Sequence, residues 1–259
     1  MRPNKLIITL IFCLILCACA STQNKKTAEK ENPAQDEFDK AVISLNYNLF
    51  DEAIRYLNNA ITLDSSNPQY YYTLGLAYFQ KKDYPQAEQA FKQCLTLQPD
   101  HVMALNSLGV VYQERQLFDK AEEQYNKAFS IDGNFDSACN LSRLYLEQEK
   151  LEPALNYIRA AIQKNNNSSE AFNIQGVIYN KMGRFPEAIQ SLLQALRIDP
   201  QFMVAGINLG VAYINNQEFS KARDLFEKML PYVQDQALKD RINEYLELIK
   251  DRNGNISYS

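Results

Sequence analysis

The stretch YYYTLGLAYFQKKDYPQAEQAFKQCLTLQPD at residues 70–100 contains the pattern that decides the fold. The pattern returns as ALNSLGVVYQERQLFDKAEEQYNKAFSIDGN at 104–134 and as AFNIQGVIYNKMGRFPEAIQSLLQALRIDPQ at 171–201. Each stretch has a glycine followed three residues later by a tyrosine, then an aromatic residue after a turn. An alanine and a large apolar residue four positions on complete it. Self-similarity with a period of about 20 to 50 residues indicates a solenoid of stacked units.

Six copies of the pattern follow one another along the chain. They occupy 34–67, 68–101, 102–134, 135–168, 169–202 and 203–236. Their length and chemistry resemble the tetratricopeptide repeat, a helix-turn-helix unit of about 34 residues. The resemblance implies an all-α fold, a right-handed superhelical solenoid of six repeats. An apolar stripe at helical spacing predicts a C-terminal capping helix over 237–250, and residues 251–259 are predicted to be a disordered tail.

Two small positions recur in the copies and predict close packing of the two helices. The eighth position is glycine in four copies, and the twentieth is alanine in all six. Larger side chains at these positions would hold the helices apart. The tyrosine that comes three residues after the small position is expected to fill the gap toward the next helix. The first and fourth copies depart from the pattern, because Ala41 and Ser142 replace the glycine.

The amino terminus has the composition of a targeting segment. Arg2 and Lys5 precede an apolar run over 6–16, which is shorter than the roughly 20 residues that span a bilayer. The sequence Leu-Cys-Ala-Cys at 16–19 resembles the lipobox of bacterial lipoproteins. The resemblance implies that residues 1–18 are a signal peptide and that Cys19 carries a covalent lipid. The alternative is an ordinary secretory signal cut near Ala20, with Cys19 incidental.

The segment after the lipobox bears on location. Residues 19–33 contain the cysteine and then small, polar and charged residues, which is typical of a flexible tether. Ala20 follows the cysteine, whereas an aspartate there retains many Gram-negative lipoproteins at the inner membrane. We therefore expect an outer-membrane lipoprotein whose repeats lie on the periplasmic side.

The remaining composition argues against catalysis and nucleic-acid binding. The formal net charge is −4, so the chain has no excess of basic residues for a phosphate backbone. Its single histidine, His101, falls between the second and third repeats, where we expect an exposed turn. Cys94 and Cys139 are a whole repeat apart and are expected to be free thiols. The sequence therefore predicts neither an enzyme nor a metal site, and no cofactor besides the lipid on Cys19.

The remaining candidate site is the concave surface that the first helices of such repeats form. The resemblance places nine residues on it: Tyr72, Phe79, Asn106, Asn140, Arg143, Asn173, Asn180, Asn208 and Asn215. An asparagine side chain can donate to and accept from a peptide backbone at the same time. The series predicts a groove that holds an extended peptide segment. The alternative is that asparagine merely keeps the groove soluble. The family's clamp for a carboxyl-terminal carboxylate is absent, because Phe38, Val42, Tyr72 and Leu76 occupy its positions.

The layout of lipid anchor, short tether and six repeats resembles the pilotin and pilus-biogenesis lipoproteins of type IV pilus systems. The resemblance implies a membrane-anchored scaffold that binds protein partners, including a secretin or a pilus component. Two alternatives share the layout or part of it. One is a scaffold for another cell-envelope or polysaccharide-export assembly. The other is a secreted, soluble protein-binding module, should Cys19 carry no lipid.

Overall fold

The computed structural model describes residues 32–256 of the 259-residue chain. That part of the chain forms thirteen α-helices and one short 3-10 helix, with no strand. The first three pairs are α2 (Pro33–Asn46) with α3 (Phe50–Leu63), α4 (Pro68–Gln80) with α5 (Tyr84–Leu97), and α6 (Val102–Glu114) with α7 (Phe118–Asp132). The next three are α8 (Phe135–Glu147) with α9 (Leu151–Lys164), α10 (Ser169–Lys181) with α11 (Phe185–Ile198), and α12 (Met203–Asn215) with α13 (Phe219–Met229). The 3-10 helix η2 (Leu230–Tyr232) and the long helix α14 (Gln236–Ile256) follow.

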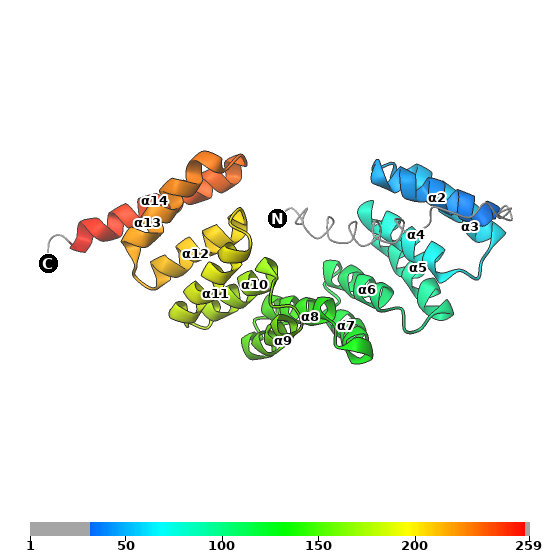
Figure 1. The fold of residues 1–259 in the computed structure, drawn as a ribbon, viewed down its shortest axis with the longest axis horizontal. Helices are drawn as coiled ribbons and strands as arrows, with labels where there is room; N and C mark the ends of the chain where they lie inside the picture. The colour runs from blue at the N-terminus through cyan, green and yellow to red at the C-terminus, as the bar shows by residue number, and fades with distance from the viewer. Residues whose placement is uncertain (1–31, 257–259) are drawn as a thin grey trace, which may run out of the picture.

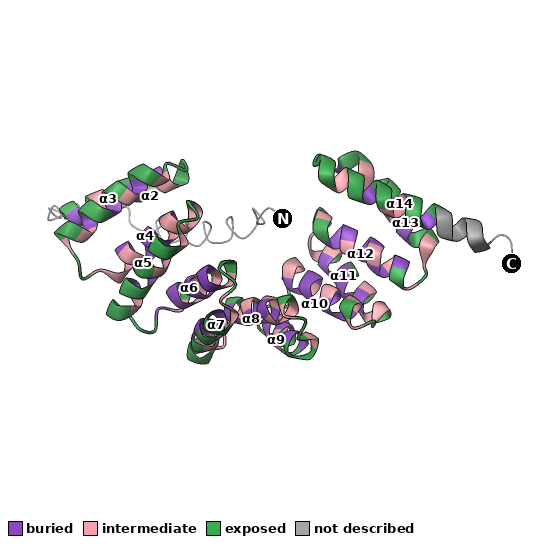
Figure 2. Ribbon diagram, turned by 180° about the vertical axis from the view of Figure 1, so that it is seen from behind, coloured by how far each residue is buried: buried purple, intermediate pink, exposed green. Residues whose placement is uncertain are grey.

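The helix pairs succeed one another along an open arc (Figure 1). The even-numbered helices from α2 to α12 lie on the inner side of the arc, and the odd-numbered helices from α3 to α13 lie on the outer side. Each pair packs on the next pair in the chain, and buried residues lie between the helices along the whole arc (Figure 2). The predicted fold class, an all-α repeat solenoid, is therefore confirmed.

The boundaries of the structure can be compared with those expected from the sequence. The first helix of each pair begins within one residue of the expected start of its repeat. The last helix differs, because α14 continues to Ile256 and so enters the tail that was expected to be disordered from residue 251. Residues 1–31 and 257–259, including the expected signal peptide and Cys19, lie outside the described residues. Between 32 and 256, no helix has both the length and the apolar character that a bilayer crossing requires.

In four repeats the glycine at the eighth position lies directly against a large side chain of the second helix. A Cβ atom added to Gly75 would lie 2.5 Å from the ring of Phe91, and one added to Gly176 would lie 2.5 Å from Cγ of Leu192. Gly109 with Tyr125 and Gly210 with Phe226 repeat the arrangement. The glycine is thus required by the large side chain that covers it, which is an aromatic ring in three of the four repeats and Leu192 in the fifth repeat.

The two repeats without this glycine have an aliphatic side chain opposite, as the fifth repeat does. The corresponding residues of the first repeat are Ala41 and Leu57, which lie in one buried cluster. In the fourth repeat they are Ser142 and Ile158, both fully buried, and the Ser142 hydroxyl donates to the carbonyl of Ala154 at 2.9 Å. The departures from the glycine pattern are therefore compensated within the same helix pair.

The turn inside each repeat has a left-handed residue that the pattern did not reveal. Five of these residues are not glycine: Asn48, Lys82, Gln116, Glu149 and Gln217. The sixth is Gly183, with a φ of 74°. Left-handed backbone costs a non-glycine residue roughly 1 to 2 kcal/mol. The turn is therefore fixed by the helix pair that it joins, because Lys82, Gln116, Glu149 and Gln217 do not favour this conformation.

The tyrosines after the small position connect neighbouring repeats. The Tyr145 ring stacks on Tyr157 of the following helix α9 at 5.6 Å between centroids, as the sequence predicts. Two of the tyrosine hydroxyls also reach back to the second helix of the preceding repeat. Tyr112 donates to Glu88 at 3.1 Å, and Tyr145 donates to Glu122 at 2.7 Å. Burial raises the pKa of Tyr112, so its hydroxyl stays protonated as a donor. These bonds tie α6 to α5 and α8 to α7.

The glycine–ring contact can be tested by exchanging it for the pair found in the first repeat. We expect Gly75→Ala to lower the free energy of unfolding by about 1 to 3 kcal/mol, because its methyl group overlaps the Phe91 ring. Phe91→Leu alone should also destabilise, because it leaves a cavity. The double variant has the Ala and Leu of the first repeat and should lose less than the sum. Additive losses in a double-mutant cycle, measured by chemical denaturation, would contradict the contact.

Candidate functional site: the inner surface

The inner helices place the predicted residues along the arc, but not all of them reach the surface. Phe79 is half-buried at the end of α4, with its ring centroid 5.8 Å from that of Tyr84. Tyr72 is only 4% exposed, so the prediction that it lines the groove is wrong. Its ring lies 5.9 Å from Phe91 and 5.0 Å from the ring of His101, measured between centroids. Tyr72 is a core residue between the second and third repeats.

His101 also differs from its expected place in an exposed turn. It is buried, and it immediately precedes α6. Its Nδ1 atom accepts a hydrogen bond from the backbone N–H of Ala104 at 3.1 Å, so the side chain caps the helix. Burial lowers the pKa of the imidazole from its ordinary value. The neutral ring is the form that can accept this bond.

The asparagines form pairs that cross from one inner helix to the next. Asn140 on α8 donates to Asn106 on α6 at 3.5 Å. Further along, Asn208 donates to Asn173 at 2.8 Å and Asn215 donates to Asn180 at 3.0 Å, both from α12 to α10. Six of the predicted site residues are thus brought together in three pairs.

Each asparagine pair keeps hydrogen-bonding capacity after its mutual bond. A primary amide has two N–H donors and an oxygen with two lone pairs, and the mutual bond uses one donor and one lone pair. Five of the six side chains are half-buried or exposed, whereas Asn173 is buried and so does not line the groove as predicted. The pairs therefore present both donors and acceptors at two places along the inner surface, one between α6 and α8 and the other between α10 and α12.

An aliphatic row lies at one repeat position of the inner helices. It consists of half-buried residues: Val42, Leu76, Val110, Val177 and Val211. The fourth repeat interrupts it with Arg143, whose guanidinium forms an ion pair with Glu170 on α10. Arg143 is therefore not an open cation for a ligand's carboxylate, which the sequence alone did not reveal.

Two more apolar residues belong to the inner helices and were not among the predicted site residues. Met103 near the start of α6 is 50% exposed, and Val204 near the start of α12 is 37% exposed. Both occupy the second position of their repeat. Alignment of that position would have identified them, because glutamine, aspartate or glutamate occupies it in the other four repeats.

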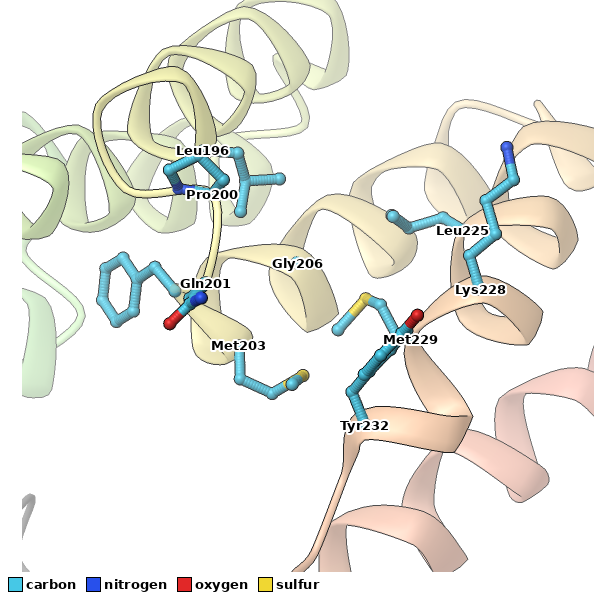
Figure 3. Close-up of a pocket in the computed structure, with 10 residues that line it drawn as sticks. Leu196, Pro200, Gln201, Met203, Gly206, Leu225, Lys228, Met229 and Tyr232 are labelled. Atoms are coloured by element: carbon cyan, nitrogen blue, oxygen red, sulfur yellow. The ribbon is translucent and has the colours of Figure 1, made fainter.

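A separate hollow of about 610 Å³ lies where the turn after α11 meets the start of α12 and the end of α13. Figure 3 shows Met203, Met229 and Tyr232 around it, with Gly206 on α12 between them. The fourth residue of the repeat is Gly206 here, whereas Tyr71 and Phe172 stand at that position in the second and fifth repeats. Met203 and Met229 line the hollow, and methionine side chains are flexible. The hollow is therefore an adaptable contact between the last two repeats.

The ionisable side chains do not assemble a metal centre in the described part of the chain. Between residues 32 and 256 no three histidine, cysteine or acidic side chains cluster in a way that could hold a metal ion. Cys94 and Cys139 are both buried free thiols, as predicted. Burial raises the pKa of Cys94 to about 11 and that of Cys139 to about 12. Both are therefore unreactive at neutral pH, since the thiolate is the nucleophile.

Comparison with known families now identifies the architecture. Four tetratricopeptide-repeat family models match the chain, at residues 48–82, 68–134, 139–201 and 179–242. The chain is a tetratricopeptide-repeat protein. Repeats of this family typically form non-catalytic scaffolds for protein–protein interaction.

The curated relatives are longer proteins. A TPR repeat-containing protein of Methanocaldococcus jannaschii is 25% identical over 213 residues, which are 80% of this chain and 32% of that protein. Human tetratricopeptide repeat protein 6 is 31% identical over 93 residues, which are 36% of this chain and 16% of that protein. This tetratricopeptide-repeat chain therefore spans a third or less of the length of these relatives.

Solved structures share the fold. PilF of Pseudomonas aeruginosa has a TM-score of 0.69 at 13% identity, and the match covers 82% of this chain and 97% of that one. YrrB, described as a TPR protein with an unusual peptide-binding site, has a TM-score of 0.57 at 22% identity, covering 73% and 97%. The Cut9–Hcn1 structure gives 0.70 at 15% identity, covering 95% and 46%. At these identities the likeness shows the tetratricopeptide-repeat fold alone.

The His101 cap makes stability depend on pH. The pKa in the folded chain lies below the ordinary value of 6.5, so the cap's contribution is present above pH 6.5 and is lost as the pH falls through the folded value. Between pH 7.5 and 5 we expect the free energy of unfolding to fall by about 0.5 to 2 kcal/mol. His101→Asn keeps a capping oxygen that does not titrate, so it should remove this part of the dependence. Parallel pH profiles of the two chains would contradict the assignment.

Proposed function

We propose that the protein is a scaffold whose inner surface binds an extended segment of a partner protein. The three asparagine pairs are the observation that carries this proposal. An extended peptide exposes an N–H and a C=O at every residue, and the pairs offer an acceptor and a donor together. Such contacts hold a backbone without selecting its side chains.

The aliphatic row supplies the second part of the recognition. Val110, Val177 and Val211 lie half-buried on the same inner helices as the asparagines. Alternate side chains of an extended segment point to one face, so they can contact this row while the backbone contacts the amides. Arg143 is the one charged residue at this repeat position, and its ion pair with Glu170 neutralises it. A segment with uncharged apolar side chains therefore suits the surface better than an acidic one.

A peptide-binding experiment tests the inner surface directly. Sequences selected from a random peptide display library serve as probes, and their dissociation constants are measured by fluorescence anisotropy. We expect Asn140→Ala with Asn208→Ala to weaken binding about tenfold, which corresponds to one or two lost hydrogen bonds. The matched control is Asn58→Ala on the outer helix α3, where Asn58 is exposed.

Two results would contradict this role of the asparagines. Equal affinities of the double variant and the control would show that the selected peptides bind elsewhere. A large drop in the thermal unfolding temperature of the double variant would show that the pairs are structural. Little change in unfolding together with weaker binding is the expected combination.

We also propose that the scaffold is anchored to the outer membrane by a lipid on Cys19 and assists type IV pilus or secretin assembly. The Leu-Cys-Ala-Cys sequence at 16–19 and the order of anchor, tether and repeats support it. The likeness to PilF extends to the fold only. A cell-envelope or polysaccharide-export scaffold has the same layout, so the partner has to be found in cells.

The anchor is tested by labelling. Cells that express the full chain and are fed radiolabelled palmitate should incorporate the label into this protein, and Cys19→Ser should abolish incorporation. Several acyl chains hold a protein on a bilayer almost permanently, so the variant should also leave the membrane fraction. An unlabelled wild-type chain would contradict the anchor. Cys17→Ser is the matched control, because the preceding Leu16 is too large for cleavage at that point.

A further inference from the structure

The first repeat leaves one face of its inner helix without the neighbour that every later repeat has. The tenth repeat residue is fully buried, at 0% exposure, in the other five inner helices, where it is Ala77, Val111, Leu144, Ile178 and Ala212. Each of these helices packs on the outer helix of the preceding repeat. In α2 the same position is Ile43, and it is 56% exposed. A residue of the buried type therefore lies on the outside.

The exposed apolar surface continues beyond Ile43. Tyr47, four residues later and directly after the end of α2, is 73% exposed, and Leu49, which immediately precedes α3, is 47% exposed. Figure 2 shows most of the visible surface of α2 as exposed. The end repeats of solenoids usually have a polar outer face, which keeps the array soluble. A run of exposed large apolar residues at this end indicates an interaction surface instead.

Charges of both signs precede these apolar residues on the same face. Asp36 and Lys40 lie two turns and one turn before Ile43, at the spacing that stacks side chains along one side of a helix. Lys40 pairs with Glu37 at 2.5 Å, whereas Asp36 forms no ion pair with any residue between 32 and 256. The face thus runs from an unpaired acid through a base to two apolar residues.

This order is complementary to itself. When two copies of a helix pack antiparallel about a two-fold axis, residue i of one copy contacts residue j of the other and the reverse contact is also made. An axis midway between Asp36 and Tyr47 places the Tyr47 hydroxyl of each copy beside the Asp36 carboxylate of the other. It also places Ile43 against the alkyl chain of the opposite Lys40.

We propose that Asp36, Lys40, Ile43 and Tyr47 form the interface of a homodimer, with the α2 helices of two copies packed antiparallel. Other occupants fit the face less well. The preceding residues 19–32 contain no large apolar side chain that could cover it. An anionic lipid surface would meet three acidic residues of α2, which are Asp36, Glu37 and Asp39. A single helix pair buries little area, so the dimer is weak and reversible.

Sedimentation velocity over a concentration series tests the dimer, using the full chain in a mild detergent. We expect a concentration-dependent shift from monomer to dimer. Ile43→Ser combined with Tyr47→Ser should raise the dissociation constant at least about tenfold, because it removes the two central apolar contacts. Leu193→Ser on α11 is the matched control, since Leu193 is 42% exposed at a distance along the arc, and it should leave the dimer unchanged. Circular dichroism checks that each variant remains folded.

Cross-linking gives a second and independent measurement. Ile43 lies close to the proposed axis, so Ile43→Cys should yield a disulfide-linked dimer on mild oxidation, above the level of the unsubstituted chain. Leu193→Cys should not. A chain that stays monomeric up to its solubility limit would overturn the proposal and assign the face to another occupant. A dimer that persists in the Ile43 and Tyr47 double variant would also overturn it.

Discussion

The contact between a glycine on the inner helix and a large side chain on the outer helix sets the geometry on which the other contacts depend. In the second, third and sixth repeats an aromatic ring occupies the space where a Cβ atom would be. This brings the two helix axes close together, and close helices bury the alanines of both at 0% exposure. The first and fourth repeats reach similar packing with alanine or serine opposite an aliphatic residue. In these five repeats a smaller residue opposite accompanies a larger one at the eighth position, as expected for a close-packed interior, whereas the fifth repeat pairs Gly176 with Leu192.

Once the pairs are built, polar contacts connect them. Tyr112 and Tyr145 each bond to an acid on the preceding outer helix, and Lys181 forms an ion pair with Glu149 of the preceding repeat at 2.6 Å. These contacts join one repeat to its immediate neighbour. The inner helices are then near enough for asparagine side chains to bond across them. The candidate site is therefore a product of the stacking, because no single repeat contains a complete asparagine pair.

The repeat period and the small positions were enough to predict the fold, because they recur at fixed spacing and each has a packing reason. The inner surface was harder to predict. Alignment treats Tyr72 and Asn106 as equivalent, yet Tyr72 is covered by the ring of His101, which caps the first helix of the next repeat. The pairing of Arg143 with Glu170 likewise joins residues of different repeats. Each asparagine pair joins residues 34 or 35 positions apart, and the offset between adjacent helices that permits it is a three-dimensional property. Sequence reasoning thus assigned residues to the inner helices and missed what covers or binds them there.

The chain of neighbour contacts has a mechanical consequence. Each helix pair rests on the pairs beside it, and the two ends of the arc do not touch (Figure 1). The curvature of the arc is therefore set by the angles at the junctions between neighbouring pairs. A small rotation at each junction adds up to a large change in the distance between its ends. The asparagine pairs lie on the inner edge, where that rotation changes helix spacing directly. A segment bound along several pairs would therefore fix the curvature of the arc, so that occupancy of the inner surface is transmitted as a change of shape to both ends.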